Sequence, residues 1–364
     1  MIIPELPAYL TSLGGEEYIG LIIALFTLTA GLSRPFSGKL TDSWGRIPVM
    51  VFGAVVSALV ALFYPFISSV AGFLFLRFVH GLSTGFKPTG TSAYIADIIP
   101  SHKRGEAMGI SGFAGSLGMA IGPAVGPLIA ANYSIEVMFY ASSVFAFLSI
   151  AILLGLKETA KDSSGFKWQY LKIRRSEVIE PKVLVPAISL VLLVYSFGVV
   201  LTITPDFSVA LGIENKGLFF TIFTLSSMLV RFLGGRASDK YGRVTVLMVS
   251  SVFIVLSMII VGFASDATTF LVGAFLFGIG VGSGSPTTMA WTIDLSEERF
   301  RGRALATTYI ALEVGIGMGA LLSGWIYGGE ISRMPYVFGS AALLALLGFG
   351  YLWYYSRTYG TPKL

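Results

Sequence analysis

The sequence lacks cysteine altogether, has only two histidines, and carries few charges, since Asp, Glu, Lys and Arg make up 12% of its 364 residues. Without cysteine the chain has neither disulfide bonds nor thiolate metal ligands. With 54% hydrophobic residues and a mean hydropathy of +0.79, it has too little polar surface for a water-soluble domain of this length. The composition therefore predicts an all-α protein embedded in a lipid bilayer, with no metal and no cofactor.

The chain has instead a series of hydrophobic segments, each long enough to cross a hydrocarbon core of roughly 30 Å as a helix. We predict eleven complete spans, and we expect residues 1–10 to be the outer end of one more helix, with about 15 to 20 residues upstream. The predicted spans are residues 19–38, 47–66, 70–98, 105–131, 134–156, 183–206, 215–235, 244–264, 267–293, 303–327 and 334–355.

Lysine and arginine lie almost entirely on alternate connections between these spans. The intervening connections hold only Lys216 and Arg333, whereas Arg34 and Arg231 count with the basic connections. The positive-inside rule then places the basic connections and the C-terminus in the cytoplasm, as in a bacterial-type inner membrane. The net charge of +5 is explained by topology, so no nucleic-acid partner is expected.

The two halves of the chain repeat each other at an offset of 197 residues, which carries Arg34 onto Arg231 and Arg104-Gly105 onto Arg301-Gly302. The charged segment 157–182, which contains Ser163-Ser164-Gly165, is expected to link an N-terminal bundle, 1–156, to a C-terminal bundle, 183–364. Two like-oriented bundles are typical of carriers that bind a solute between them and alternate its access.

A charged loop motif occurs in both halves, as GKLTDSWGR at residues 38–46 and GRASDKYGR at 235–243. Two copies at the repeat spacing resemble the signature loop of the major facilitator superfamily. The resemblance implies two six-helix bundles, a secondary transporter, and a conformational latch of paired charges; the alternative is that these charges only mark the lipid boundary. The predicted latch residues are Gly38, Asp42, Gly45, Arg46, Asp97, Gly235, Asp239, Gly242, Arg243 and Asp294.

Span 70–98 carries a polar stripe, because Arg77, His80, Thr84 and Lys87 are spaced at i, i+3, i+7 and i+10. A cation inside a span is a functional-site candidate by default. The sequence around Arg77 also resembles a second family motif, whose arginine is associated with proton coupling. The alternatives are that Lys87 extends to the membrane interface and that His80 is a packing residue.

Glu313 lies ten residues into span 303–327, about 15 Å deep and near the bilayer centre. It is the first candidate for binding a proton or a cationic substrate, with Tyr309 one turn away. Glu5 and Asp206 are further candidates closer to the outer surface. The alternative for Glu313 is a carboxyl group neutralised by a neighbour for packing.

Span 105–131 combines small residues at four-residue spacing with two prolines, at Gly118, Gly122, Pro123, Gly126 and Pro127. Small residues let helices approach closely, and proline permits a kink. The segment also resembles a motif of the antiporter branches of the superfamily, which implies efflux; ordinary close packing is the alternative.

The predicted function is proton-coupled efflux of drugs or metabolites by a monomeric carrier. A sugar or organic-anion symporter or uniporter is the alternative within transport, with Arg77 and Lys87 binding substrate charge. A membrane receptor or channel is the alternative from another class. No enzymatic activity is expected, because the sequence has no metal-ligand spacing, no nucleophile with a base and no nucleotide-binding motif.

Overall fold

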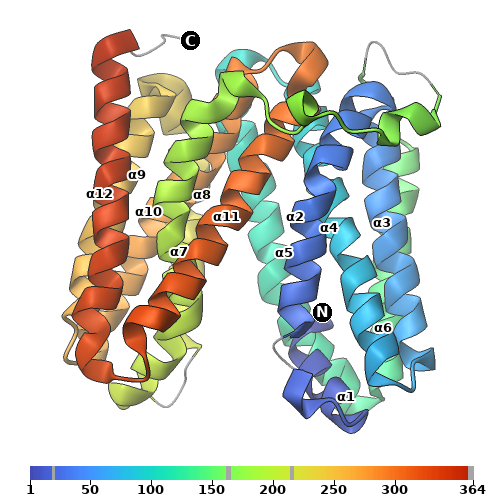
Figure 1. Ribbon diagram of the computed structural model, residues 1–364, viewed down its shortest axis with the longest axis horizontal. Coiled ribbons are helices and arrows are strands. Elements are labelled where there is room, and N and C mark those ends of the chain that lie inside the picture. Colours follow the sequence, from blue (N-terminus) through green and yellow to red (C-terminus); the bar gives the residue numbers. More distant parts are fainter. Residues whose placement is uncertain (19–20, 161–164, 214–216, 360–364) are drawn as a thin grey trace. The chain divides into compact units, whose positions relative to one another are not determined.

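The computed structural model describes residues 1–18, 21–160, 165–213 and 217–359, and all regular structure within these ranges is helical (Figure 1). Residues 161–164 of the predicted linker, with Ser163 and Ser164, lie outside the described residues, as do Lys216 and the first residues of spans 19–38 and 215–235. Eleven helices of at least 18 residues match the eleven predicted spans. They are α2 (Leu21–Ser43), α3 (Arg46–Phe63), α4 (Val70–Ile98), α5 (Arg104–Asn132), α6 (Ile135–Leu154), α7 (Leu184–Ala210), α8 (Leu218–Tyr241), α9 (Arg243–Gly262), α10 (Ala267–Leu295), α11 (Arg301–Tyr327) and α12 (Met334–Tyr359).

Nine of the helices in the described part of the chain are long and apolar enough to cross a membrane, and α8, which bends by 45° near residue 232, makes a tenth. Helix α4 has the same length as α5 and α10 but is not among these spans, and it contains the polar residues Arg77, His80 and Lys87. The all-α prediction is confirmed.

The chain forms two compact units, and each takes the first turns of one helix that ends in the other unit. The first unit consists of Met1–Ile98, Leu117–Glu180 and Ser296–Tyr309, so it contains the beginning of α11. The second consists of Ile99–Ser116, Pro181–Leu295 and Ile310–Leu364, so it contains the beginning of α5. The units follow the sequence repeat except for this exchange. The exchange places the start of α11 in the unit of the first charged motif and the start of α5 in the unit of the second.

In the first unit, α4 packs against α2 and α3, and α3 packs against α6. Glycines allow the close approach: a Cβ atom on Gly53 of α3 would lie 2.8 Å from the backbone nitrogen of Lys87 on α4. The short helix α1 (Leu6–Ser12) and the 3-10 turn Ile3–Glu5 confirm that the first residues are helical. Leu6, Tyr64, Phe73 and Phe139 form the buried core at this end.

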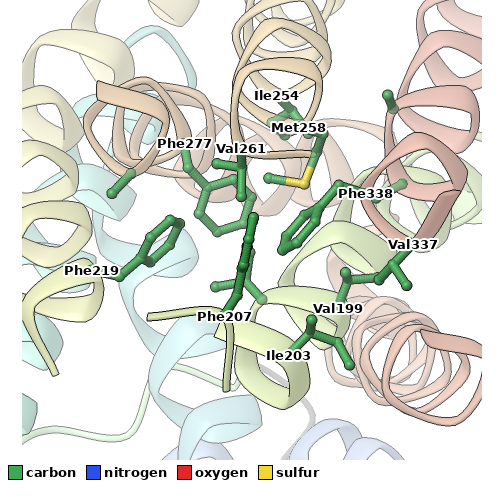
Figure 2. Packing of buried hydrophobic residues seen from close by; sticks show 14 of the residues in the cluster. Val199, Ile203, Phe207, Phe219, Ile254, Met258, Val261, Phe277, Val337 and Phe338 are labelled. Atoms are coloured by element: carbon green, nitrogen blue, oxygen red, sulfur yellow. The ribbon is translucent and has the colours of Figure 1, made fainter. Parts of the chain in front are cut away.

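In the second unit, α10 packs against α8 and α9, and α12 packs against α7 and α9. Figure 2 shows the aromatic centre of this unit, where Phe207, Phe277 and Phe338 surround Met258. The rings of Phe219 and Phe270 lie 4.9 Å apart, and all of these side chains are buried. Edge-to-face and tilted ring contacts of this kind fix the helices in one arrangement.

Candidate functional site

The carboxylate of Asp42, in the last turn of α2, binds the first turn of α11. Its Oδ1 accepts a hydrogen bond of 2.6 Å from the backbone N–H of Gly302, and its Oδ2 accepts one of 2.9 Å from the N–H of Arg303. The first N–H groups of a helix have no partner within the helix and carry partial positive charge. Asp42 therefore acts as an external cap that attaches α11 to α2.

Two arginines complete this arrangement. Arg46 donates from Nε to Asp97 over 3.0 Å and from Nη1 to Asp42 over 3.3 Å, while Arg301, the first residue of α11, donates to the other oxygen of Asp97. The side chains of Arg46 and Asp97 are only 3% and 5% exposed. We call Asp42, Arg46, Asp97, Arg301 and the amides of residues 302–303 the first clamp. Because its charges are dehydrated, removing one of them leaves the others poorly compensated.

The second unit repeats this network contact by contact. Asp239 accepts hydrogen bonds of 2.9 Å from the N–H groups of Gly105 and Glu106 at the start of α5. Arg243 pairs with Asp239 at 2.5 Å and with Asp294 at 2.8 Å, and Asp294 also accepts from Arg104 at 2.9 Å. These residues form the second clamp: Asp239, Arg243, Asp294, Arg104 and the amides of residues 105–106.

Glycines make both clamps sterically possible. A Cβ atom on Gly38 would lie 2.7 Å from the Cβ of Ala306, and Gly235 lies equally close to the backbone around Gly105. Gly45 and Gly242 have φ of 134° and 91°, values that residues with a side chain rarely adopt. Gly38 and Gly235 therefore allow two helices to cross closely. Gly45 and Gly242 allow a sharp turn directly before Arg46 and Arg243.

The linker contacts the first clamp directly. Glu158 accepts hydrogen bonds of 3.0 Å from the N–H groups of Arg46 and Ile47, and Thr159 donates to Asp97 over 2.7 Å. Glu180 binds Arg303, with 2.7 Å between Nε and the carboxylate. The first clamp is therefore held by linker residues at both the start of α3 and the start of α11.

A cavity of about 370 Å³ lies beside the first clamp, between the end of α2, the linker and the start of α11. Lys39 and Glu177 both line this cavity, and the Nζ of Lys39 forms an ion pair with Glu177 at 2.8 Å. The hydrogen bond from Lys39, followed by one from the backbone of Arg174, lowers the pKa of Glu177, so this linker contact is ionic at neutral pH. The cavity lining is Lys39, Asp42, Ser43, Tyr170, Glu177, Arg299, Phe300 and Arg303.

The residues of the predicted polar stripe of α4 have two different sets of neighbours. Arg77 is fully buried, donates from Nε to the carbonyl of Ile22 over 3.0 Å, and lies over the ring of Phe26 at 4.7 Å. A ring nitrogen of His80 is 3.5 Å from Arg77, so these two predicted residues meet. Lys87 instead donates to Ser149 of α6 over 2.8 Å, and Thr84 is half-buried between them.

The remaining predicted residues lie on other elements of the chain. The hydroxyl of Tyr309 is 3.1 Å from Ser92, while Glu313 is half-buried near the middle of the 27-residue helix α11. Glu5 is half-buried in the first 3-10 turn, and Asp206 of α7 is exposed. Among the described residues, Glu313 is the carboxyl group farthest from either end of a long helix.

The glycines of the predicted helix-five motif contact the beginning of the chain. A Cβ atom on Gly122 would lie 2.9 Å from the backbone nitrogen of Met1, and Gly126 is equally close to the Met1 backbone, whereas Gly118 faces open space. Pro123 and Pro127 lie inside α5 without ending it. This segment therefore provides close packing for a neighbouring chain segment, which is the arrangement expected for small residues.

Sequence reasoning missed two parts of the site. The first part is Arg104 and Arg301 with the backbone amides that follow them, which belong to the clamps. In the sequence, the only signal for these residues was their repetition at the 197-residue offset. Arg34 and Arg231 were assigned to the basic connections, and this was wrong. Both arginines already fell inside the predicted spans 19–38 and 215–235, and they lie inside α2 and α8, about 14 to 15 Å from the helix ends.

Spanning helices in two repeated units, each with a charge clamp on a helix start, define a membrane carrier whose halves can change their contacts. The model of the Major Facilitator Superfamily matches residues 1–219 and 187–364, so the chain belongs to that family. The predicted family and fold are confirmed, and the protein is a secondary active transporter.

Relatives and solved structures cover nearly the whole chain. It is 26% identical to the multi-drug resistance efflux pump PmrA of Streptococcus pneumoniae, covering 90% of this chain and 85% of PmrA. It is 25% identical to the quinolone resistance protein NorA of Staphylococcus aureus, covering 93% of this chain and 88% of NorA. The crystal structure of the human organic anion transporter MFSD10 is similar in fold, with a TM-score of 0.79, 18% identity, and coverage of 95% and 88%.

Proposed function

We propose that this protein exports drugs or hydrophobic metabolites in exchange for protons, as a monomer in the cytoplasmic membrane with its C-terminus inside. The similarity to PmrA and NorA over most of their length supports the efflux assignment. The distribution of Lys and Arg supports the orientation, because it places both clamps at the cytoplasmic ends of the helices. The paired clamps are the observation that carries the proposal.

The clamps supply the conformational part of the mechanism. While Asp42 caps α11 and Asp239 caps α5, the cytoplasmic ends of these helices are held to α2 and α8. Opening toward the cytoplasm requires both helix starts to detach and their amides to find water. Because the charges are nearly dehydrated in the clamped state, each clamp switches between two discrete arrangements rather than loosening gradually.

Glu313 supplies the proton-coupling part. It is half-buried in the middle of α11, one turn beyond Tyr309, and α11 is the helix whose start the first clamp holds. Protonation and deprotonation of a carboxyl group at this depth change the charge of a helix that must move. Entry of a proton from outside and its exit to the inside would thus be linked to the detachment of the start of α11 from α2 and to its return.

Glu313→Gln should abolish pH-driven accumulation of ethidium in everted vesicles while leaving ethidium binding intact. Glutamine has the shape of glutamate, but its side chain cannot take up and release a proton. Accumulation is followed by fluorescence with and without an imposed pH gradient. Glu330→Gln is the matched control, since Glu330 is exposed and pairs only with the nearby Arg333. Full pH-driven accumulation in Glu313→Gln would contradict its role, and no saturable accumulation in the wild type would contradict the proposed function itself.

A further inference from the structure

Arg34 and Arg231 occupy equivalent positions in the repeat, but only Arg34 has partners that suit a buried guanidinium. Arg34 is 2% exposed and donates from Nη1 to the carbonyl of Gly85 and the hydroxyl of Thr89, both at 3.3 Å. Its guanidinium also lies over the ring of Tyr309, 4.2 Å from the ring centre. A carbonyl, a hydroxyl and an aromatic face therefore replace the water that Arg34 lost on burial.

Two of these three partners have no equivalent in the second unit, whereas Gly282 keeps the carbonyl that corresponds to that of Gly85. At the 197-residue offset, Thr89 corresponds to Pro286 and Tyr309 corresponds to Gly112, so the hydroxyl and the ring are both absent. Arg231 is half-buried, and its side chain donates no hydrogen bond to any residue in the described part of the chain. Gly112 lies directly against the guanidinium, where a Cβ atom would overlap Nη1.

A second polar group without a partner lies one turn before Arg231. The hydroxyl of Ser227 is buried and has no hydrogen-bond partner among the described residues, whereas the corresponding residue in the first unit is Ala30. Residues four apart on a helix share a face, so this hydroxyl and the guanidinium lie on the same side of α8. The second unit has thus lost acceptors around its arginine and gained a donor.

The acidic groups nearby are already engaged. Glu106 pairs with Arg236, and both carboxylates of the second clamp pair with Arg243. None of the ion pairs among the described residues includes Arg231. An uncompensated cation in a spanning helix is costly, and such residues are rare unless a ligand or a water-filled path supplies the missing partner.

We propose that Arg231 is an anion-recognition site that binds the carboxylate of an aromatic substrate. The planar guanidinium presents parallel N–H donors that match a carboxylate, and the Ser227 hydroxyl adds a further donor. The substrate ring would be buried among apolar membrane helices, which favours an organic acid with an apolar body over a hydrophilic anion. This substrate class rests on the proposed transport function, and Arg231 gives it a charge preference.

The test measures binding directly on the full-length protein in detergent. Benzoate, salicylate and 1-naphthoate are compared with their neutral amides by the ligand-dependent rise in Tm, since a ligand that binds only the folded state raises Tm. At least one carboxylate should stabilise the wild type while its amide does not, and Arg231→Gln should weaken that binding by at least about tenfold, the value of one charge-assisted hydrogen bond. Arg236→Gln is the matched control, because Arg236 is exposed on the same helix.

A second variant keeps the proposal falsifiable if Arg231→Gln does not fold. Pro286→Thr restores the hydroxyl that Thr89 provides in the first unit, so it should give Arg231 an internal partner and weaken carboxylate binding without affecting the amides. The proposal is overturned if none of the three carboxylates raises Tm, or if folded Arg231→Gln or Pro286→Thr binds them as the wild type does. Ethidium export, measured in parallel, separates the outcomes: export without carboxylate binding would refute only the anion site.

Discussion

Asp42→Asn should slow transport about 10- to 100-fold while leaving the apparent affinity for substrate within about twofold. The expected size follows from one charge-assisted hydrogen bond to a helix start, about 1.5 to 3 kcal/mol, at about 1.4 kcal/mol for each tenfold change. Asparagine can accept from one amide of α11 but cannot accept from both, and it no longer balances Arg46. Turnover and KM for ethidium are measured in vesicles at equal protein density.

Asp239→Asn is the internal comparison, because Asp239 makes the same contacts with the start of α5 that Asp42 makes with the start of α11. It should slow transport as well, and the double variant should be slower than either single variant. Asp266→Asn is the control: Asp266 accepts hydrogen bonds from Thr269 at the start of α10 and belongs to neither clamp, so its replacement should leave transport unchanged. A defect in KM alone for Asp42→Asn would contradict the clamp.

Arg77→Lys should nearly abolish transport although it keeps the positive charge. Arg77 both donates from Nε to the Ile22 carbonyl and lies flat over Phe26, and an ammonium group on a flexible chain cannot reproduce that geometry. The contact joins α4 to α2, so its loss should also lower the Tm of the purified protein. Transport and Tm are measured on the same preparation.

Lys87→Gln is the matched control on the same helix. Lys87 donates to Ser149 of α6 and is not part of the contact between Arg77 and α2. Its replacement should therefore leave most of the transport activity. If Arg77→Lys transports normally, or if Lys87→Gln is the more damaging change, the assignment of the functional face of α4 is wrong.

The positions of the helices could be predicted from the sequence because span length and apolar composition are local properties. Each predicted span matches a helix within a few residues, except that α2 and α8 continue beyond their predicted ends through the signature motifs. Charge was therefore an unreliable boundary signal there. Arg34 and Arg231 were counted with the basic connections, and the extended helices show that each lies well before the end of its helix.

The charge pairs Asp42 with Arg46 and Asp239 with Arg243 were also predictable, because they are four residues apart on one element. The partners of these pairs were not. Nothing local indicates that the start of α11 binds α2 or that the start of α5 binds α8, since these contacts join residues more than 100 positions apart. The sequence also could not predict that Lys87 and Arg77 contact different helices. The contact of Lys87 depends on the packing of α6 against α3 and on the position of Ser149.

The central claim is that α11 must leave α2 during every transport cycle, and a reversible cross-link across the first clamp tests it most directly. The chain has no cysteine, so Ser43→Cys and Phe300→Cys, at two residues that line the cavity beside the clamp, can be introduced without competing thiols and joined by a thiol-reactive cross-linker that contains a reducible bond. Cross-linking should stop transport, reduction should restore it, and each single variant should be insensitive to the cross-linker. Full transport by the cross-linked protein would contradict the account.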